Sequence, residues 1–297
     1  MKFKISVSFL VVCFLLGPAQ SLAQDSYVAF GDGVIVSVRA EMHRSMTAQE
    51  KSLDESIAYH TVESPDVNAF AVIQNGQRQI TVYAGLIEAI DYLATVESAS
   101  LLWNRPSCSG QYAIYLADLA ASNTEAITQG LRAKNITEPF QYMKSNPASC
   151  PDVSQDDMIA NKRKSGDLRT IQIQEGIKFV LLHEFAHHLH NDFSPISDLG
   201  EKRAVERRAD NYAFQSMLHP PETPTAAISV IALFAAQEDL HLDIASSNHP
   251  SGLRRLKAMV DATRTSESWK QALTLATPDQ IQTINNSFAE IDRLTTE

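Results

Sequence analysis

The sequence predicts an α+β fold that is mainly helical and has a small antiparallel sheet along one wall of a cleft. Two β-rich runs flank Asn75-Gly76, a dipeptide typical of a tight hairpin turn. Most of the remaining chain carries apolar residues at helical spacing. The length of 297 residues, with 44% hydrophobic and 20% charged residues, suits one large globular domain.

Residues 1–23 are expected to be a cleaved secretory signal peptide. Two lysines precede an apolar run over residues 5–16, and Ser21-Leu22-Ala23 supplies the small-x-small pattern of a cleavage site. The apolar run is too short to span a bilayer comfortably. The mature chain, residues 24–297, is therefore expected to be one exported domain, periplasmic or secreted, with no stable membrane span.

The charge of the chain limits its partners. The formal net charge is −10 and no run of basic residues is present. Nucleic acids and anionic membrane surfaces attract basic proteins, so neither is the expected partner.

The first elements are predicted from local patterns. Residues 26–39 are mixed and do not decide between strand and helix. A helix is expected over 47–57, with Thr47 as its N-terminal cap, and helical spacing resumes at Gly85. Between them the predicted strands are residues 59–62, 68–73 and 79–83.

Residues from about 95 to 165 are interpreted as an insertion held by a disulfide. Cys108 and Cys150 are the only cysteines after the signal peptide, and an even pair in an oxidising compartment is typical of one bridge. It would close a loop of about forty residues and contribute about 4 kcal/mol to stability. The alternative is two free, buried thiols. A helix is expected over residues 111–121.

The second half is expected to be helical throughout. Ser194-Pro195 would end the first of these helices, and Thr277-Pro278 would begin the last one as cap and first residue. The predicted helices are residues 168–191, 201–218 and 226–236, a helical stretch after His249-Pro250, and a final helix from about 277.

The segment His183-Glu184-Phe185-Ala186-His187 indicates a metal site. Histidines at i and i+4 project from one face of a helix, so both imidazoles can reach one ion. Glu184 lies beside the first histidine, where it can take a proton from an attacking water. One Zn²⁺ is the expected ion, although the sequence leaves another divalent metal open.

A catalytic zinc site needs a third protein ligand, and three residues are candidates. His190 lies at i+7 from His183, on the same face but far along the axis, and His188 points elsewhere. Glu206 is favoured because it shares a helix face with Asp210, so that one carboxylate can bind the metal while the other orients a ligand imidazole. The alternative is a solvated helix with Glu–Arg pairs.

Several motifs occur together in a recognisable order. They are the Asn68-Ala69-Phe70-Ala71 strand, a second strand at Ile80-Thr81-Val82, a helix start at Gly85-Leu86-Ile87, His183 to His187, Glu206-x-x-Ala209-Asp210, and His249-Pro250 followed by a helical Arg255. In this order they resemble the gluzincin metallopeptidases typified by the CAAX prenyl endopeptidase and the HtpX-type heat-shock protease. Two features depart from that family: no transmembrane helix follows the signal peptide, and the stretch before His183 is long and contains the cysteines.

The resemblance implies a zincin-type metallopeptidase fold and a role for each motif residue. The implied metal ligands are His183, His187 and Glu206, the implied catalytic residues are Glu184 and His249, Asp210 would orient a ligand histidine, and Asn68 would lie on an edge strand that binds the substrate backbone. His249 would face the reacting carbonyl and help to stabilise the oxyanion.

The resulting hypothesis is a zinc-dependent endopeptidase that hydrolyses exported or envelope polypeptides. One alternative is a metal-stabilised periplasmic chaperone or assembly factor with a closed cleft, which the presence of Glu184 disfavours. Another is the class of antitoxin-regulating peptidases with an ExxAN motif, which Glu206-x-x-Ala209 followed by Asp210-Asn211 approaches. Export and the Asn68 strand favour the first hypothesis.

Overall fold

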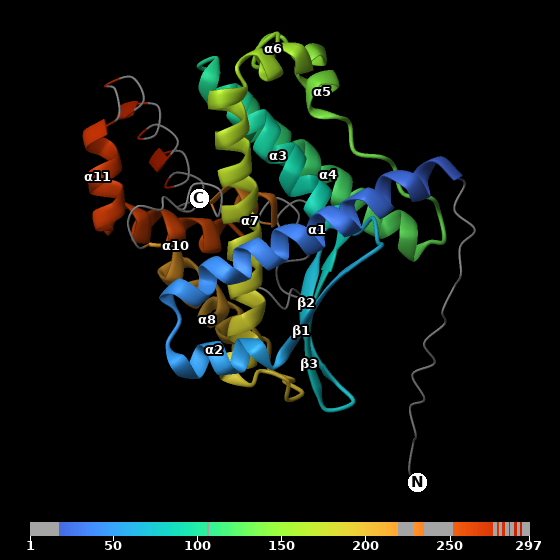
Figure 1. Ribbon diagram of the computed structural model, residues 1–297, viewed down its shortest axis with the longest axis vertical. Coiled ribbons are helices and arrows are strands. Elements are labelled where there is room, and N and C mark those ends of the chain that lie inside the picture. The colour runs from blue at the N-terminus through green and yellow to red at the C-terminus, as the bar shows by residue number, and fades with distance from the viewer. Residues whose placement is uncertain are drawn as a thin grey trace.

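A small three-stranded sheet lies at one side of a mainly helical fold in the computed structural model (Figure 1). The structure describes residues 18–105, 107–218, 228–234, 252–275 and scattered positions from 278 to 292, with side chains from residue 27 onward apart from a few positions. The elements in chain order are α1 Pro18–Ser45, α2 Ala48–Glu55, β1 Ile57–Val62, β2 Ala69–Gln74, β3 Gln77–Tyr83, α3 Ala84–Leu102, α4 Ser107–Thr128, α5 Pro139–Ser145, α6 Gln155–Ala160, α7 Lys162–His190, α8 Leu199–Met217, α10 Gly252–Thr265 and α11 Glu267–Leu275. The predicted mainly helical α+β class is confirmed.

The predicted hairpin is confirmed, but the sheet is mixed rather than antiparallel. Asn75 and Gly76 adopt φ angles of 52° and 78°, as a tight hairpin turn requires, and β2 pairs antiparallel with β3. The strand order is β1-β3-β2, and β1 runs parallel to β3. A two-residue turn forces an antiparallel pair, whereas the longer connection over residues 63–68 carries the chain across to the far side of β3. The expectation of a wholly antiparallel sheet was therefore wrong for β1.

Gly85 allows that connection to pass over the start of α3. Its amide donates to the carbonyl of Ser64 at 2.8 Å. A Cβ atom at this position would lie 2.4 Å from the carbonyl oxygen of Pro65, closer than real contacts allow. The glycine that marks the helix start in the sequence is thus required by the loop that leads from β1 to β2.

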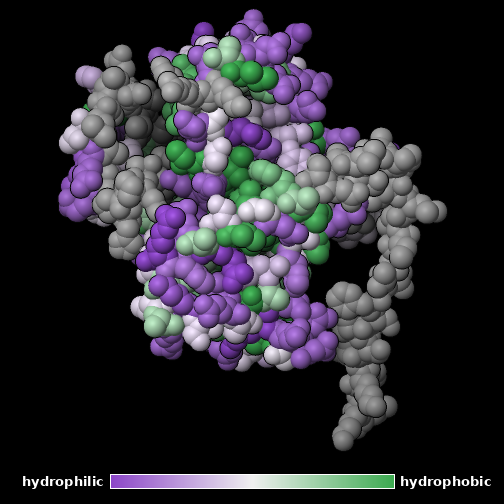
Figure 2. All heavy atoms as spheres, viewed as in Figure 1, coloured by the Kyte–Doolittle hydropathy of each residue, from purple (hydrophilic) through white to green (hydrophobic). Residues whose placement is uncertain are grey.

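The undecided segment 26–39 lies within α1. Ile35, Val38 and Met42 are spaced three and four residues apart, and all are buried in the main hydrophobic core with residues of β3, α3 and α7. Figure 2 shows apolar residues gathered along the middle of this face of the molecule, near α1, with polar residues towards its two ends. The packing of one face on α7 and on the sheet decides the helical conformation, which the sequence pattern left open.

α7 is the helix around which the other elements are arranged. It contacts α1, α3, α6, α8, β2 and β3, and its residues 177–186 are buried on every side of the helix. It begins at Lys162, six residues before the predicted start, and ends at His190, ahead of Ser194-Pro195. Because α7 lies inside the fold rather than on its surface, side chains in its second half are held on all sides.

The region from about 95 to 165 forms a helical layer with its own hydrophobic core. α3 continues through residue 95 to Leu102, and the predicted helix at 111–121 extends over the whole of α4. Buried residues of α3, α4, α5 and α6 form a second cluster, separate from the main core. α3 contributes to both clusters, so it is the wall between the two layers.

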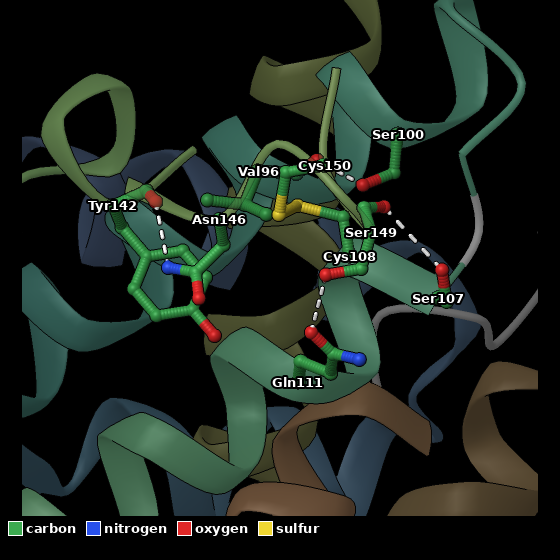
Figure 3. Close-up of a disulfide and its surroundings, with 9 residues drawn as sticks. All are labelled: Val96, Ser100, Ser107, Cys108, Gln111, Tyr142, Asn146, Ser149 and Cys150. Carbon is green, nitrogen blue, oxygen red and sulfur yellow. Dashed lines mark hydrogen bonds between the residues drawn. A yellow bond between two sulfur atoms is a disulfide. The ribbon is translucent and has the colours of Figure 1, made fainter. Parts of the chain in front are cut away.

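The predicted disulfide is confirmed (Figure 3). Cys108, in the first turn of α4, is bonded to Cys150 with a Cα–Cα distance of 4.7 Å, and both residues are buried. Around the bridge, Ser107 donates to the carbonyl of Ser149 at 3.3 Å, and the Asn146 amide donates to the carbonyl of Tyr142 at 2.8 Å. The bond joins α4 to the segment between α5 and α6.

The remaining helices agree with the predicted positions. α8 covers the predicted 201–218 almost completely, residues 228–234 are helical within the predicted 226–236, and α10 and α11 form the helical stretch after His249-Pro250. The start of the predicted final helix at Thr277 lies outside the described residues. Within the described part of the chain, no helix is both long and apolar enough to cross a membrane.

Candidate metal centre

His183 and His187 project from the same face of α7. Their Nε2 atoms lie 3.3 Å apart, and their ring centroids are separated by 5.0 Å. The flanking apolar residues Leu181, Leu182 and Phe185 are fully or almost fully buried, so this turn of α7 sits firmly in the core. The two imidazoles therefore converge on one point at the edge of the core.

Glu206 of α8 completes the cluster. Its Oε2 lies 3.3 Å from His183 Nε2, and its Oε1 lies 3.8 Å from His187 Nε2. One ligand atom from each of the three residues lies within 4.8 Å of the others. α8 packs against α7, and the fully buried Ala209 and Ala213 leave room for the two helices to approach.

The two competing histidines lie elsewhere. His188 Nε2 is 3.0 Å from the carbonyl oxygen of Gln79 on β3, and its ring is almost fully buried against the sheet. His190 packs edge-on near the ring of Tyr212, at 6.5 Å between centroids. Of the three residues weighed as a third ligand, only Glu206 is brought to the two converging imidazoles.

Asp210 holds the other ring nitrogen of His183. Asp210 Oδ1 lies 3.0 Å from His183 Nδ1, and Arg255 of α10 makes two bonds to the same carboxylate, at 2.7 and 2.8 Å. Burial by itself would raise the pKa of Asp210, but the guanidinium and His183 lower it to about 2. Asp210 and the helical Arg255, which the sequence placed in separate motifs, thus form one connected unit that fixes His183.

The electrostatics of His183 favour a positive charge at the site. Burial lowers the pKa of an imidazole, yet the hydrogen bonds with Asp210 and Glu206 outweigh this and raise the pKa of His183 to about 10. The same carboxylates that stabilise a proton on this ring would stabilise a metal cation beside it.

Asp192 is a site residue that the sequence reasoning missed. Its Oδ2 lies 3.4 Å from His187 Nδ1, its other oxygen is paired with Arg208, and its side chain is almost fully buried. The signal in the sequence was Asn191 directly after the histidine-rich helix, because asparagine often adopts the left-handed conformation that ends a helix and reverses the chain.

Glu184 faces the sheet beside the cluster. Burial raises its pKa, while the charges of His183 and His187 and a hydrogen bond from the backbone amide of Ala71 act in the opposite direction. Ala71 lies on β2, which is an edge strand of the sheet. Glu184 is thus placed between the two candidate ligand histidines and β2, an edge strand among the described residues.

Of the two remaining candidates, the structure describes only Asn68, which is not among the three clustered residues. Asn68 is exposed and precedes β2, where its Oδ1 accepts from the amide of Ala69 at 2.9 Å and its carbonyl accepts from Tyr83 at 3.1 Å. It begins the strand rather than lying within it. His249 lies outside the described residues.

The donor set fits a zinc ion. Each candidate ligand histidine has a carboxylate beside Nδ1, which favours a proton at Nδ1 and leaves Nε2 facing the cluster. The two Nε2 atoms and the Glu206 carboxylate converge on one point, where a metal ion would take the place of the proton that His183 otherwise holds. Two imidazoles and one carboxylate are a common ligand set of catalytic zinc.

A comparison with known protein families finds one that matches this chain. No curated protein and no solved structure matches it. The sequence model of the family Peptidase U49 matches residues 117–275, which is just over half of the chain. The matched segment runs from the middle of α4 to the end of α11. The match contains His183, His187, Glu206 and their carboxylate partners, whereas the three strands and Asn68 precede it. The chain belongs to the peptidase U49 family, and that family implies hydrolysis of polypeptides.

Proposed function

We propose that this protein is a zinc-dependent endopeptidase of the gluzincin type that acts on exported or envelope polypeptides. The observation that carries the proposal is the convergence of His183, His187 and Glu206 beside the buried carboxyl group of Glu184. A purely structural metal site needs no general base beside its ligands. When bound, zinc would supply Lewis acidity towards a carbonyl oxygen.

Glu184 is the proposed general base and acid. It would accept a proton from the attacking water and later deliver it to the leaving amine. The burial that raises its pKa brings the carboxyl group closer to the range in which it can both accept and return a proton near neutral pH. The backbone amide of Ala71, on β2, is one of the groups that favour the charged form of this carboxylate.

β2 is the proposed binding edge for the substrate backbone. An extended peptide can add to a free strand edge through main-chain hydrogen bonds, and the Ala71 amide of β2 already faces Glu184. Asn68 stands at the beginning of this strand, so its side chain could hold the peptide at one end of the edge. The role of His249 in stabilising the oxyanion rests on the resemblance to the prenyl endopeptidase family alone.

Export is part of the proposal. The signal-like segment over residues 1–23 motivates it, and the buried disulfide supports it because such bonds persist mainly in oxidising compartments. Cleavage after residue 23 would leave most of α1, including its packed face, in the mature protein.

The proposal is tested with zinc-loaded mature protein, residues 24–297, and an unfolded protein such as casein as substrate. Wild type should cleave the substrate, whereas Glu184→Gln should be slower by about 100-fold or more with its zinc content unchanged. Glu55→Gln, an exposed residue at the end of α2, is the matched control and should cleave at the wild-type rate. If wild type and Glu184→Gln both hold zinc and neither cleaves, a metal-stabilised chaperone is the better interpretation.

A further inference from the structure

The C-terminal end of α7 reverses the chain directly behind His187. Asn191 adopts φ 56° and ψ 47°, the left-handed conformation, and its amide donates to the carbonyl groups of His187 and His188. The amide of Asp192 then donates to the carbonyl of His187 at 3.0 Å. This pattern of bonds is the one that ends many helices at a left-handed residue.

The reversal is what brings the Asp192 side chain to the ring of His187. A residue five positions further along a continuous helix is rotated about 140° away from His187, because each residue turns the helix by about 100°. After the left-handed residue, Asp192 Oδ2 lies instead 3.4 Å from His187 Nδ1. One residue therefore holds both the backbone carbonyl and the imidazole of His187.

Asp192 is itself held from the next helix. Its side chain is almost fully buried, and Arg208 of α8 is paired with Asp192 Oδ1. Arg208 lies two residues after Glu206 on α8. The same helix therefore supplies the candidate ligand Glu206 and the arginine that holds Asp192, the carboxylate beside His187. The arrangement parallels the pairing of Arg255 with Asp210 behind His183.

We propose that the end of α7 is part of the metal centre, with Asp192 as the positioning residue of His187, Asn191 as the turn that places it and Arg208 as its anchor. Asp192 accepts the Nδ1 proton of His187, which leaves Nε2 as the metal-binding atom and sets the angle of the ring. The inference rests on the proposed metal site, and it adds three residues to that site that the metal-binding pattern itself does not contain.

The experiment measures metal binding rather than catalysis alone. Zinc affinity of the mature protein is determined by competition with a chelator, and the cobalt(II)-loaded protein gives an absorption spectrum that reports the ligand geometry. Asp192→Ala should weaken zinc binding by about 10- to 100-fold and change the cobalt spectrum. Asp192→Asn keeps an acceptor oxygen, so it should retain most of the affinity.

The turn and the anchor have their own variants. Asn191→Gly should bind zinc as wild type does, because glycine adopts the left-handed conformation freely, whereas Asn191→Val should weaken binding. Arg208→Ala should weaken zinc binding by roughly a few-fold, because Asp192 stays beside His187 but loses its ion pair with Arg208. Arg207→Ala, its exposed neighbour, is the matched control and should have no effect.

The outcomes separate this inference from the proposed function. If wild type binds no zinc, the metal site itself is wrong. If wild type binds zinc and Asp192→Ala binds it equally, with the same cobalt spectrum, the positioning role is wrong although the peptidase proposal stands. If Asp192→Ala does not fold, the pair Asn191→Gly and Asn191→Val decides, and equal zinc affinity in these two overturns the inference.

Discussion

Both candidate ligand histidines use their two ring nitrogens for different purposes. In each ring Nε2 faces the cluster and Nδ1 faces a carboxylate, which is Asp210 for His183 and Asp192 for His187. Each of these carboxylates is paired with an arginine from a different helix. Local geometry at single residues thus decides which nitrogen of each ring is available to a metal.

The sequence could name some of these residues and not others. The i, i+4 spacing places His183 and His187 on one face without further information. Asp210 could be expected because it shares a helix face with Glu206. Asp192 could not be expected from helical periodicity, since its position depends on the left-handed conformation of Asn191.

A residue-scale prediction concerns Glu97 of α3, whose carboxylate accepts from Ser229 at 3.2 Å. Burial raises its pKa from 4.5 to about 7. Between these values the folded state binds more protons than the unfolded state, so the contribution of Glu97 to stability is present below pH 4.5 and is lost as the pH rises through 7. Glu97→Gln does not titrate and should gain on the order of 1–3 kcal/mol over wild type above pH 7.

The measurement is urea unfolding of both proteins at several pH values from 4.5 to 8. The difference in the free energy of unfolding between variant and wild type should grow with pH across this window. A constant difference would show that Glu97 titrates normally in the folded protein. Glu55→Gln, a change of the same kind at an exposed position, is measured alongside as the matched control.

At the scale of elements, the predicted start of α2 agrees with the structure because a capping residue marks it in the sequence. Thr47 and Glu50 form the reciprocal capping bonds at the start of α2, and the helix begins at the expected place. Its end was less well predicted, because Ile57 belongs to β1 rather than to the helix. A β-branched residue such as Ile57 has only a weak local preference for strand over helix. Here its pairing with β3 decides that it belongs to the strand.

An element-scale prediction concerns Gly85 in the first turn of α3. Gly85→Ala should destabilise the protein, by about 1–3 kcal/mol, because its Cβ would overlap the backbone of Pro65 and Asp66, which cannot move away as a flexible side chain would. Gly33→Ala is the matched control, since it lies in α1 with open space around it. That change should be neutral or stabilise by up to about 1 kcal/mol.

Thermal and urea unfolding of the two variants test this prediction. Equal stabilities for Gly85→Ala and wild type would mean that the loop over residues 63–68 can shift at little cost. The close approach of this loop to α3 would then not determine the path of the chain between β1 and β2.

At the scale of the whole molecule, two hydrophobic clusters share α3 as a common wall. The candidate metal cluster of His183, His187 and Glu206 belongs to the layer of the main core, where α7 and α8 pack together. The disulfide belongs to the other layer, which α4, α5 and α6 form against α3. The bridge is therefore expected to stabilise the fold without taking part in metal binding.

A whole-molecule prediction follows for the Cys108→Ser, Cys150→Ser double variant. Removal of a bridge that closes a loop with a sequence separation of 42 should lower the free energy of unfolding by about 4 kcal/mol. The comparison is urea unfolding of the double variant and of wild type, with zinc affinity measured where both are folded. Stability equal to that of wild type would contradict this prediction, and loss of zinc binding by the folded variant would contradict the separation of the two layers.

The sequence by itself determined the fold class, the hairpin at Asn75-Gly76, the position of most helices and the convergence of His183 and His187. Each of these depends on neighbours within a few residues or on a short repeat, so a local pattern contains the information. Tertiary structure alone decided that α1 is a helix and that β1 runs parallel to β3. It also brought Glu206, which the sequence favoured over His188 and His190, to the two imidazoles. These features depend on contacts between segments far apart in the chain, where packing and burial outweigh local preference.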